Sequence, residues 1–220
     1  MTPEAVQHLV RADKTLARII RKVGPCRLTP KKRRSPFEAL VQSVAHQQLN
    51  GTAATTILRR VIALYPHRRF PLPEDLLRTP DEHLRGAGLS RAKTASLKDI
   101  AAKTIEGVVP TARAIAKMGD AEIIERLTTV RGVGPWTVEM LLMFTLGRPD
   151  VLPVTDYGVR KGFALAYGLS ELPTPRELLN HGERWRPHRT TAAWYLWRAV
   201  ELLDPAPIQR LRREQNTSSL

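Results

Sequence analysis

A pair of glycines between two apolar helical segments is the feature that most constrains this chain. Gly132 and Gly134 stand in the stretch LTTVRGVGPWT at 127–137, with apolar residues at helical spacing before and after it. Because glycine has no Cβ, such a pair favours a tight turn that another backbone can approach closely. We therefore predict a helix-hairpin-helix at about 121–146. Its backbone N–H groups and following helix N-terminus suit a nucleic-acid phosphate, whatever the base sequence.

A single carboxylate follows about twenty residues later, at Asp156 in the segment LPVTDY. Its place before an apolar helical pattern suits an N-cap, and Thr155 would suit that role as well. A phosphate-binding hairpin together with a carboxylate suggests chemistry on a nucleotide. Both roles can coexist in Asp156, since a helix N-terminus favours an ionised carboxylate.

Helix start signals recur along the chain, whereas strand patterns do not. Serine or threonine followed by proline, with glutamate at the third helical position, occurs in the segments beginning at Ser35, Thr79 and Thr174. This order of residues is typical of a capped helix start. A single amphipathic helix is expected near the N-terminus, and a long one ends the apolar pattern near Leu203. The predicted fold class is all-α.

Charge and cysteine content narrow the class of partner. The 220 residues carry a formal net charge of +14, which favours a polyanion, although a basic soluble protein or one that meets anionic membranes would share this charge. Cys26 is the single cysteine, so an intramolecular disulfide or a cysteine-bound metal cluster is excluded. No apolar run reaches the length of a membrane span and no signal-peptide core is evident, so we expect a protein inside the cell.

The hairpin and Asp156 together resemble the helix-hairpin-helix DNA glycosylases. Within that superfamily the chain looks most like the 3-methyladenine DNA glycosylase II branch, because Trp136 follows the hairpin glycines and the segments ERWRPHR at 183–189 and YLW at 195–197 match. The resemblance covers about 35–203 and does not include the additional N-terminal domain of some members. The endonuclease III relatives are disfavoured, since their C-terminal four-cysteine cluster has no counterpart in this chain.

The resemblance implies two helical lobes with an active-site cleft between them that holds Asp156. We expect a central lobe at 36–149, a second lobe built from 1–35 and 150–205, and a flexible tail at 206–220. It also implies base excision repair of double-stranded DNA that contains damaged bases. The expected protein is a monomer, located in the bacterial cytoplasm with the nucleoid, or in the nucleus of a eukaryote.

The implied reaction is the flipping and hydrolytic excision of alkylated bases of the 3-methyladenine and 7-methylguanine type, with Asp156 as the catalytic carboxylate. Relatives that cut the strand use a lysine two residues after the second hairpin glycine, where this chain has Trp136. Arg131 stays protonated and forms no imine. A monofunctional enzyme is therefore expected. Electron-rich ring faces attract cationic purines, and the resemblance places the base pocket at Trp136, Met140, Tyr157 and Trp197.

Further residues are expected to hold the DNA or an ion. Gln48 falls at the position of the wedge that fills the space left by the flipped base. The other predicted DNA contacts are Gln47, Lys93, Arg131, Gly132, Val133 and Gly134. No cofactor is expected, apart from a monovalent Na⁺ or K⁺ that the hairpin carbonyls of Thr128, Val130 and Val133 would bind, as family hairpins do.

Two other functions stay open at this stage. A non-catalytic helix-hairpin-helix DNA-binding module would need the basic charge and the glycines, but it would leave Asp156 and the aromatic residues unexplained. A glycosylase for a neutral lesion such as uracil, hypoxanthine or mispaired adenine would need an acid or a specific donor. His46 and His188 are the candidates for that role.

Overall fold

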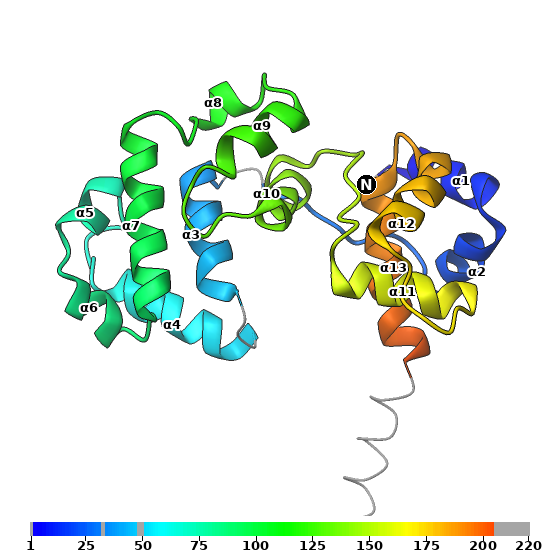
Figure 1. Cartoon of the computed structure of the whole chain (residues 1–220), viewed down its shortest axis with the longest axis horizontal. Coiled ribbons are helices and arrows are strands. Elements are labelled where there is room, and N and C mark those ends of the chain that lie inside the picture. The colour runs from blue at the N-terminus through cyan, green and yellow to red at the C-terminus, as the bar shows by residue number, and fades with distance from the viewer. Residues whose placement is uncertain (1, 32–33, 48–50, 205–220) are drawn as a thin grey trace, which may run out of the picture. The chain divides into compact units, whose positions relative to one another are not determined.

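The computed structural model describes residues 2–31, 34–47 and 51–204, and in this part of the chain every regular element is helical (Figure 1). The prediction of an all-α fold is confirmed. Tail residues 206–220 and the proposed wedge Gln48 lie outside the described residues. None of the helices described is long and apolar enough to span a bilayer.

The chain divides into two compact units. We call Pro30–Gly147 the hairpin unit, and Met1–Thr29 with Arg148–Leu220 the aspartate unit. The sequence places the first boundary at 35/36, whereas the hairpin unit begins at Pro30. One reason is that the Lys31 N–H donates a hydrogen bond of 2.7 Å to the carbonyl of Phe144, which ties the segment before the first helix of this unit to its last turn.

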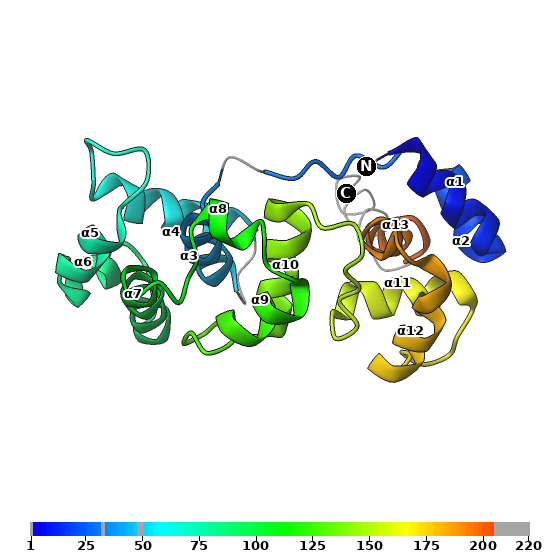
Figure 2. The ribbon, with the colours of Figure 1, turned by 90° about the horizontal axis from the view of Figure 1, so that it is seen from above.

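The hairpin unit is built around α3, which packs against both α7 and α10 (Figures 1 and 2). Leu40 of α3, Ile100 of α7 and Val138 of α10 are fully buried in this core, and burying each such side chain contributes roughly 1.5–3 kcal/mol. The helices are α3 (Pro36–His46), α4 (Gly51–Ala63), α5 (Pro73–Arg78), α6 (Asp81–Gly86), α7 (Arg91–Ile105), α8 (Ala112–Ile115), α9 (Asp120–Leu127), α10 (Pro135–Leu141) and the π-helical turn η1 (Leu142–Leu146).

The aspartate unit is built around α13, which packs most extensively against α11 and also contacts α1 and α2. The side chains of Trp185, Tyr195 and Leu196 are fully buried in its core. Its helices are α1 (Pro3–Ala12), α2 (Lys14–Val23), α11 (Tyr157–Tyr167), α12 (Pro175–Gly182), the 3₁₀ turn η2 (Glu183–Trp185) and α13 (Arg189–Leu203).

The N-terminal segment forms two helices, so the expectation of a single amphipathic helix is wrong. Asp13 ends α1 in an extended conformation and caps α2, its Oδ1 accepting from the N–H groups of Thr15 and Leu16 at 3.0 and 2.9 Å. Aspartate competes with the helical backbone for such hydrogen bonds and therefore favours a cap over a helix interior.

Helices begin at all three predicted starts, and two of the three predicted hydroxyl caps are confirmed. Ser35 Oγ accepts from the Glu38 N–H, and Thr174 forms a reciprocal capping box with Glu177. At the third a helix, α6, does begin, but the prediction that Thr79 caps it is wrong, because Thr79 ends α5 and Pro80 is the N-cap of α6. The Thr79 hydroxyl instead donates to the carbonyl of Asp75 at 2.8 Å and hydrogen-bonds the Tyr65 hydroxyl at 2.7 Å.

Candidate functional site

The predicted hairpin joins α9 to α10 in the hairpin unit. The chain leaves α9 at Thr128 and turns through a hydrogen bond of 3.1 Å from the Val133 N–H to the Val130 carbonyl. The α10 helix then begins with Gly134 as its N-cap and proline at its first position. Gly134 has no side chain and therefore makes no side-chain cap on α10.

The two hairpin glycines differ in how much space surrounds them. Gly132 has a positive φ of 76°, and a Cβ on it would lie 2.4 Å from Ser96 Oγ. Its absence of a side chain is therefore a condition of the turn itself. Gly134 has an ordinary φ of −94°, and a Cβ there would meet nothing within 4 Å. A substitution of Gly134 is thus compatible with the fold and obstructs only what approaches from outside.

The hairpin backbone is supported by side chains from α3 and α7. Asp99 Oδ2 accepts a hydrogen bond of 2.8 Å from the Arg131 N–H. Gln47 Nε2 donates to the Gly132 carbonyl at 3.0 Å and to Thr137 Oγ1 at 3.1 Å. Lys93 Nζ donates to two carbonyls at the end of α3. Gln47 and Lys93, which the sequence suggests as DNA contacts, therefore have partners inside the protein.

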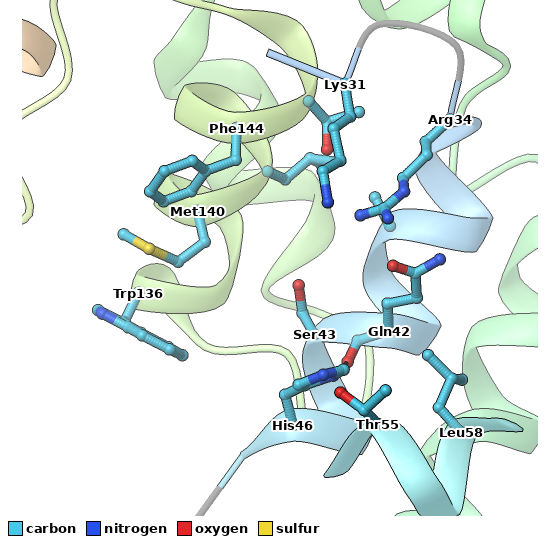
Figure 3. Close-up of a pocket in the computed structure, with 13 residues that line it drawn as sticks. Lys31, Arg34, Gln42, Ser43, His46, Thr55, Leu58, Trp136, Met140 and Phe144 are labelled. Atoms are coloured by element: carbon cyan, nitrogen blue, oxygen red, sulfur yellow. Dashed lines mark hydrogen bonds between the residues drawn. The ribbon is translucent and has the colours of Figure 1, made fainter. Parts of the chain in front are cut away.

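A cavity of about 540 Å³ opens in the same unit, lined by residues of α3, α4, α10 and η1 (Figure 3). Trp136, Met140 and Phe144 follow one another along one side of α10 and η1, one helical turn apart. His46 and Thr55 lie at one end of the cavity and Lys31 and Arg34 at the other. This volume falls within the range of small-molecule sites.

The two ends of the cavity differ in chemistry. Lys31 and Arg34 would repel a cationic base but suit a phosphate. The ring faces of Trp136, which is 39% exposed, and of Phe144 suit a flat cation. His46 Nδ1 lies 2.8 Å from the Gln42 carbonyl; since a carbonyl only accepts, Nδ1 carries a proton and donates it to this hydrogen bond.

Asp156 lies in the aspartate unit, where it is the N-cap of α11. Its Oδ1 accepts from the Val159 N–H at 2.8 Å and from the Trp197 indole N–H at 2.8 Å. The capping role that the sequence left open is therefore present. The next residue, Tyr157, is 64% exposed, while Asp156 itself is half-buried. The two hydrogen bonds fix the orientation of the Asp156 carboxylate.

Two glycines of α11 bring this carboxylate and its indole partner together, and the sequence reasoning missed both. A Cβ on Gly162 would lie 1.9 Å from the Leu196 carbonyl oxygen, and one on Gly158 would lie 2.8 Å from the Trp197 ring. At Gly162 the backbones of α11 and α13 thus approach too closely for any side chain, and at Gly158 the Trp197 ring occupies the space. The spacing Gly158-x-x-x-Gly162 was the available signal, since small residues one turn apart permit close helix packing.

Each unit thus gathers part of the predicted site. Trp136 and Met140 line the cavity of the hairpin unit, and Asp156, Tyr157 and Trp197 lie together in the aspartate unit. Sequence reasoning missed Phe144, although it continues the four-residue spacing of Trp136 and Met140. It also missed Gln42, Ser43 and Thr55 as cavity residues.

The comparisons with known proteins decide the family. A model of the "HhH-GPD superfamily base excision DNA repair protein" matches residues 41–187. The chain belongs to the HhH-GPD superfamily. Among the relatives of this HhH-GPD protein, DNA-3-methyladenine glycosylase 1 of Schizosaccharomyces pombe is 41% identical over 200 residues, which cover 90% of this chain and 87% of the relative. The alkylbase DNA glycosidase-like protein mag2 of the same yeast is 32% identical, covering 90% and 93%.

Solved structures agree with this assignment. The structure of the S. pombe 3-methyladenine DNA glycosylase in complex with abasic DNA matches with a TM-score of 0.82 and 39% identity, over 90% of this chain and 97% of that one. A DNA-3-methyladenine glycosidase of Bacillus halodurans matches with a TM-score of 0.79 and 35% identity, over 90% and 89%.

Proposed function

We propose that this HhH-GPD protein is a monofunctional DNA glycosylase that excises alkylated bases of the 3-methyladenine and 7-methylguanine type from duplex DNA. The observation that carries the proposal is the setting of Asp156, a carboxylate oriented by the Val159 N–H and the Trp197 indole in a chain with this family membership. The relatives named as 3-methyladenine glycosylases supply the lesion class.

In this reaction the bond between C1′ of the deoxyribose and the base nitrogen breaks, and its electron pair leaves with the base. Positive charge develops on the sugar, which the ionised Asp156 stabilises. Water then adds to C1′ and loses a proton to the carboxylate or to solvent, so that an abasic site remains. A methylated purine is already cationic and departs as a neutral base, so the proposal needs no strong general acid.

The cavity of the hairpin unit supports this lesion class. We assign the flipped base to the side formed by Trp136, Met140 and Phe144, where each ring face contributes about 0.5–2 kcal/mol to the binding of a cation. Lys31 and Arg34 suit the phosphate of the same nucleotide.

We expect no Schiff-base step, and two residues near the predicted catalytic site support this expectation. Trp136 occupies the position of the lysine used by strand-cutting relatives. Lys161, one turn into α11, forms an ion pair with Asp204. Neither residue offers an amine to the sugar carbon, so water remains as the nucleophile.

The decisive experiment uses end-labelled duplex DNA carrying 7-methylguanine or 3-methyladenine, with uracil, hypoxanthine and undamaged duplexes in parallel. We expect release of the methylated base and strand breaks that appear only after hot alkali. Enzyme-dependent nicks, or an adduct trapped by borohydride, would contradict the water mechanism. Binding without release from any duplex would indicate a non-catalytic module, and preferential release of a neutral base would overturn the lesion class.

The proposed DNA grip is tested with Gly134→Val. This residue has open space around its Cβ position, so the variant should fold normally. It should bind damaged and undamaged duplex about tenfold more weakly in a polarisation titration, because an obstructed charge-assisted hydrogen bond costs about 1.5–3 kcal/mol. Unchanged affinity would indicate a purely structural hairpin. Gly132 is unsuitable for this test, since its substitution disturbs the turn itself.

For the hairpin ion, we propose that the carbonyls of Thr128, Val130 and Val133 hold Na⁺ or K⁺. Backbone carbonyl oxygens are the ligands such hard cations prefer. The Val130 carbonyl already accepts from the Val133 N–H, and its second lone pair suits a cation. DNA affinity should be higher in KCl or NaCl than in tetramethylammonium chloride of equal ionic strength. Equal affinities would contradict the proposal.

A further inference from the structure

The end of α3 is the point in the hairpin unit where three helices are joined by polar contacts. α3 ends at His46, and Gln47 leaves the helix with φ −55° and ψ 134°. The last carbonyls of a helix lack partners within it and need a donor from elsewhere. Gln48, for which we predict insertion into the DNA, is the very next residue.

Lys93 supplies that donor from α7. Its Nζ lies 2.8 Å from the carbonyl oxygens of both Ala45 and Gln47. A lysine ammonium at a helix C-terminus is also favoured by the helix dipole. Desolvation lowers the pKa of Lys93, as expected for an ammonium that is partly withdrawn from solvent.

Gln47 continues the connection to α10. While its carbonyl accepts from Lys93, its side-chain amide donates to the Gly132 carbonyl and to the Thr137 hydroxyl. One residue is thereby fixed through its backbone to α7 and through its side chain to the hairpin. Ordinary solvated glutamine and lysine side chains would have no such partners 85 or 46 residues distant in the chain.

We propose that Lys93 and Gln47 are positioning residues, which together form a latch that fixes the end of α3 relative to the hairpin. When the hairpin holds a phosphate, the latch keeps the end of α3 in a fixed position beside it, so that base flipping is coupled to phosphate binding. This inference rests on the proposed function and deepens it. It also replaces direct DNA contact with an internal role for both residues.

The latch and a phosphate contact make opposite predictions for salt dependence. A lysine that neutralises a phosphate contributes about 0.9 to the slope of log K against log salt. Lys93→Met should leave this slope equal to that of Lys98→Met, a matched control that removes one charge from the same helix. Lys98 pairs with Asp81 and belongs to neither the latch nor the cavity.

The variants Lys93→Met, Gln47→Leu and Lys98→Met are compared in steady-state excision kinetics and in the fluorescence of 2-aminopurine placed next to 7-methylguanine in a duplex, which rises when the neighbouring base is flipped out. For the two latch variants we expect base flipping and kcat about tenfold lower, KM for DNA within twofold and an unchanged salt slope. Lys93→Arg should restore part of the rate, since it keeps the donors.

A salt slope lowered by about one in Lys93→Met relative to Lys98→Met, with normal flipping, would overturn the proposal. Normal flipping in Gln47→Leu would overturn it as well, and this variant keeps the test valid if Lys93→Met fails to fold. The fluorescence needs no excision. If the wild type flips but releases no base, the proposed function fails while the latch is still tested.

Discussion

Two aspartates of the aspartate unit, Asp13 and Asp156, share the same local chemistry. Each is the N-cap of a helix and accepts backbone N–H groups of its first turn. Each also accepts an indole N–H, from Trp185 at 3.0 Å and from Trp197 at 2.8 Å respectively. The combination of cap and indole is thus a way of holding a carboxylate still, and it does not by itself identify a catalytic group.

The two sites differ in burial. Asp13 is 5% exposed, and its Oδ2 also accepts from the Tyr167 hydroxyl at 2.5 Å and lies 3.0 Å from His181 Nε2. Asp156 is half-buried and is followed by the exposed Tyr157. We infer that Asp13 holds α2, α11, α12 and η2 together, whereas Asp156 can meet a substrate. The same substitution at both positions should therefore damage different properties.

The largest effect is expected for Asp156→Asn. Asparagine is an equally good N-cap and keeps the acceptor for Val159 and Trp197, but it lacks the charge that offsets the sugar cation. Excision of 7-methylguanine should fall by about 100-fold to 1000-fold, with DNA affinity and Tm unchanged. Activity within a few-fold of wild type would show that Asp156 is not the catalytic carboxylate. A large loss of Tm would show that Asp156, like Asp13, mainly stabilises the fold.

Asp13→Asn should show the reverse pattern. The amide oxygen of asparagine can accept either from the N–H groups of α2 or from the side chains that surround Oδ2 in the wild type. It cannot do both, because the amide NH₂ group then faces other donors. We expect a loss of roughly 2–4 kcal/mol in the free energy of unfolding, measured by urea denaturation. The kcat of the folded fraction should stay within twofold of wild type. A stable variant with slow chemistry would break the distinction between the two carboxylates.

Acid should weaken the Asp13 site selectively. Burial alone would raise the pKa of Asp13, but hydrogen bonds from His181, Tyr167, Leu16 and Trp185 outweigh it and hold the pKa well below the ordinary 3.8. A depressed folded pKa means that this stability is fully present above the unfolded value and is lost as the pH falls below it. The stability advantage of wild type over Asp13→Asn should therefore shrink between pH 5 and pH 2.5. A constant difference over this range would contradict the assignment.

The smallest of these effects is expected for Trp197→Phe. This change removes the indole donor to Asp156 but keeps an aromatic ring, so kcat should fall about tenfold, as expected for one lost hydrogen bond to a charged group. Trp194→Phe, on the same helix with its ring beneath Arg198, is the control and should be neutral. A full rate in Trp197→Phe would favour the ring-stacking role that the resemblance assigns to Trp197.

The fold and the functional motifs could be predicted because their signals are local. The α10 start at Gly134 and Pro135 and the cap at Asp156 depend on residues within four positions of one another. The Thr79 prediction failed because its hydroxyl has a tertiary partner, Tyr65, that no local pattern reveals.

The partners of the site residues could not be predicted for the same reason. Trp197 reaches Asp156 over 41 residues, and Gln47 reaches Gly132 over 85. Aromatic and basic residue types suggested stacking and DNA contact, but the choice between those roles and an internal hydrogen bond depends on how the helices pack. Only the structure supplies that packing.

The close crossing of α11 and α13 at Gly162 limits which parts of the protein can change by mutation when the range of excised bases changes. Because a single methyl group there would collide with the Leu196 carbonyl, the helix that begins at Asp156 cannot be re-aimed by small steps of mutation. Cavity side chains such as Met140 can be exchanged without touching that crossing. We therefore expect natural or laboratory variation in the bases removed to accumulate around Met140, while the carboxylate stays where it is.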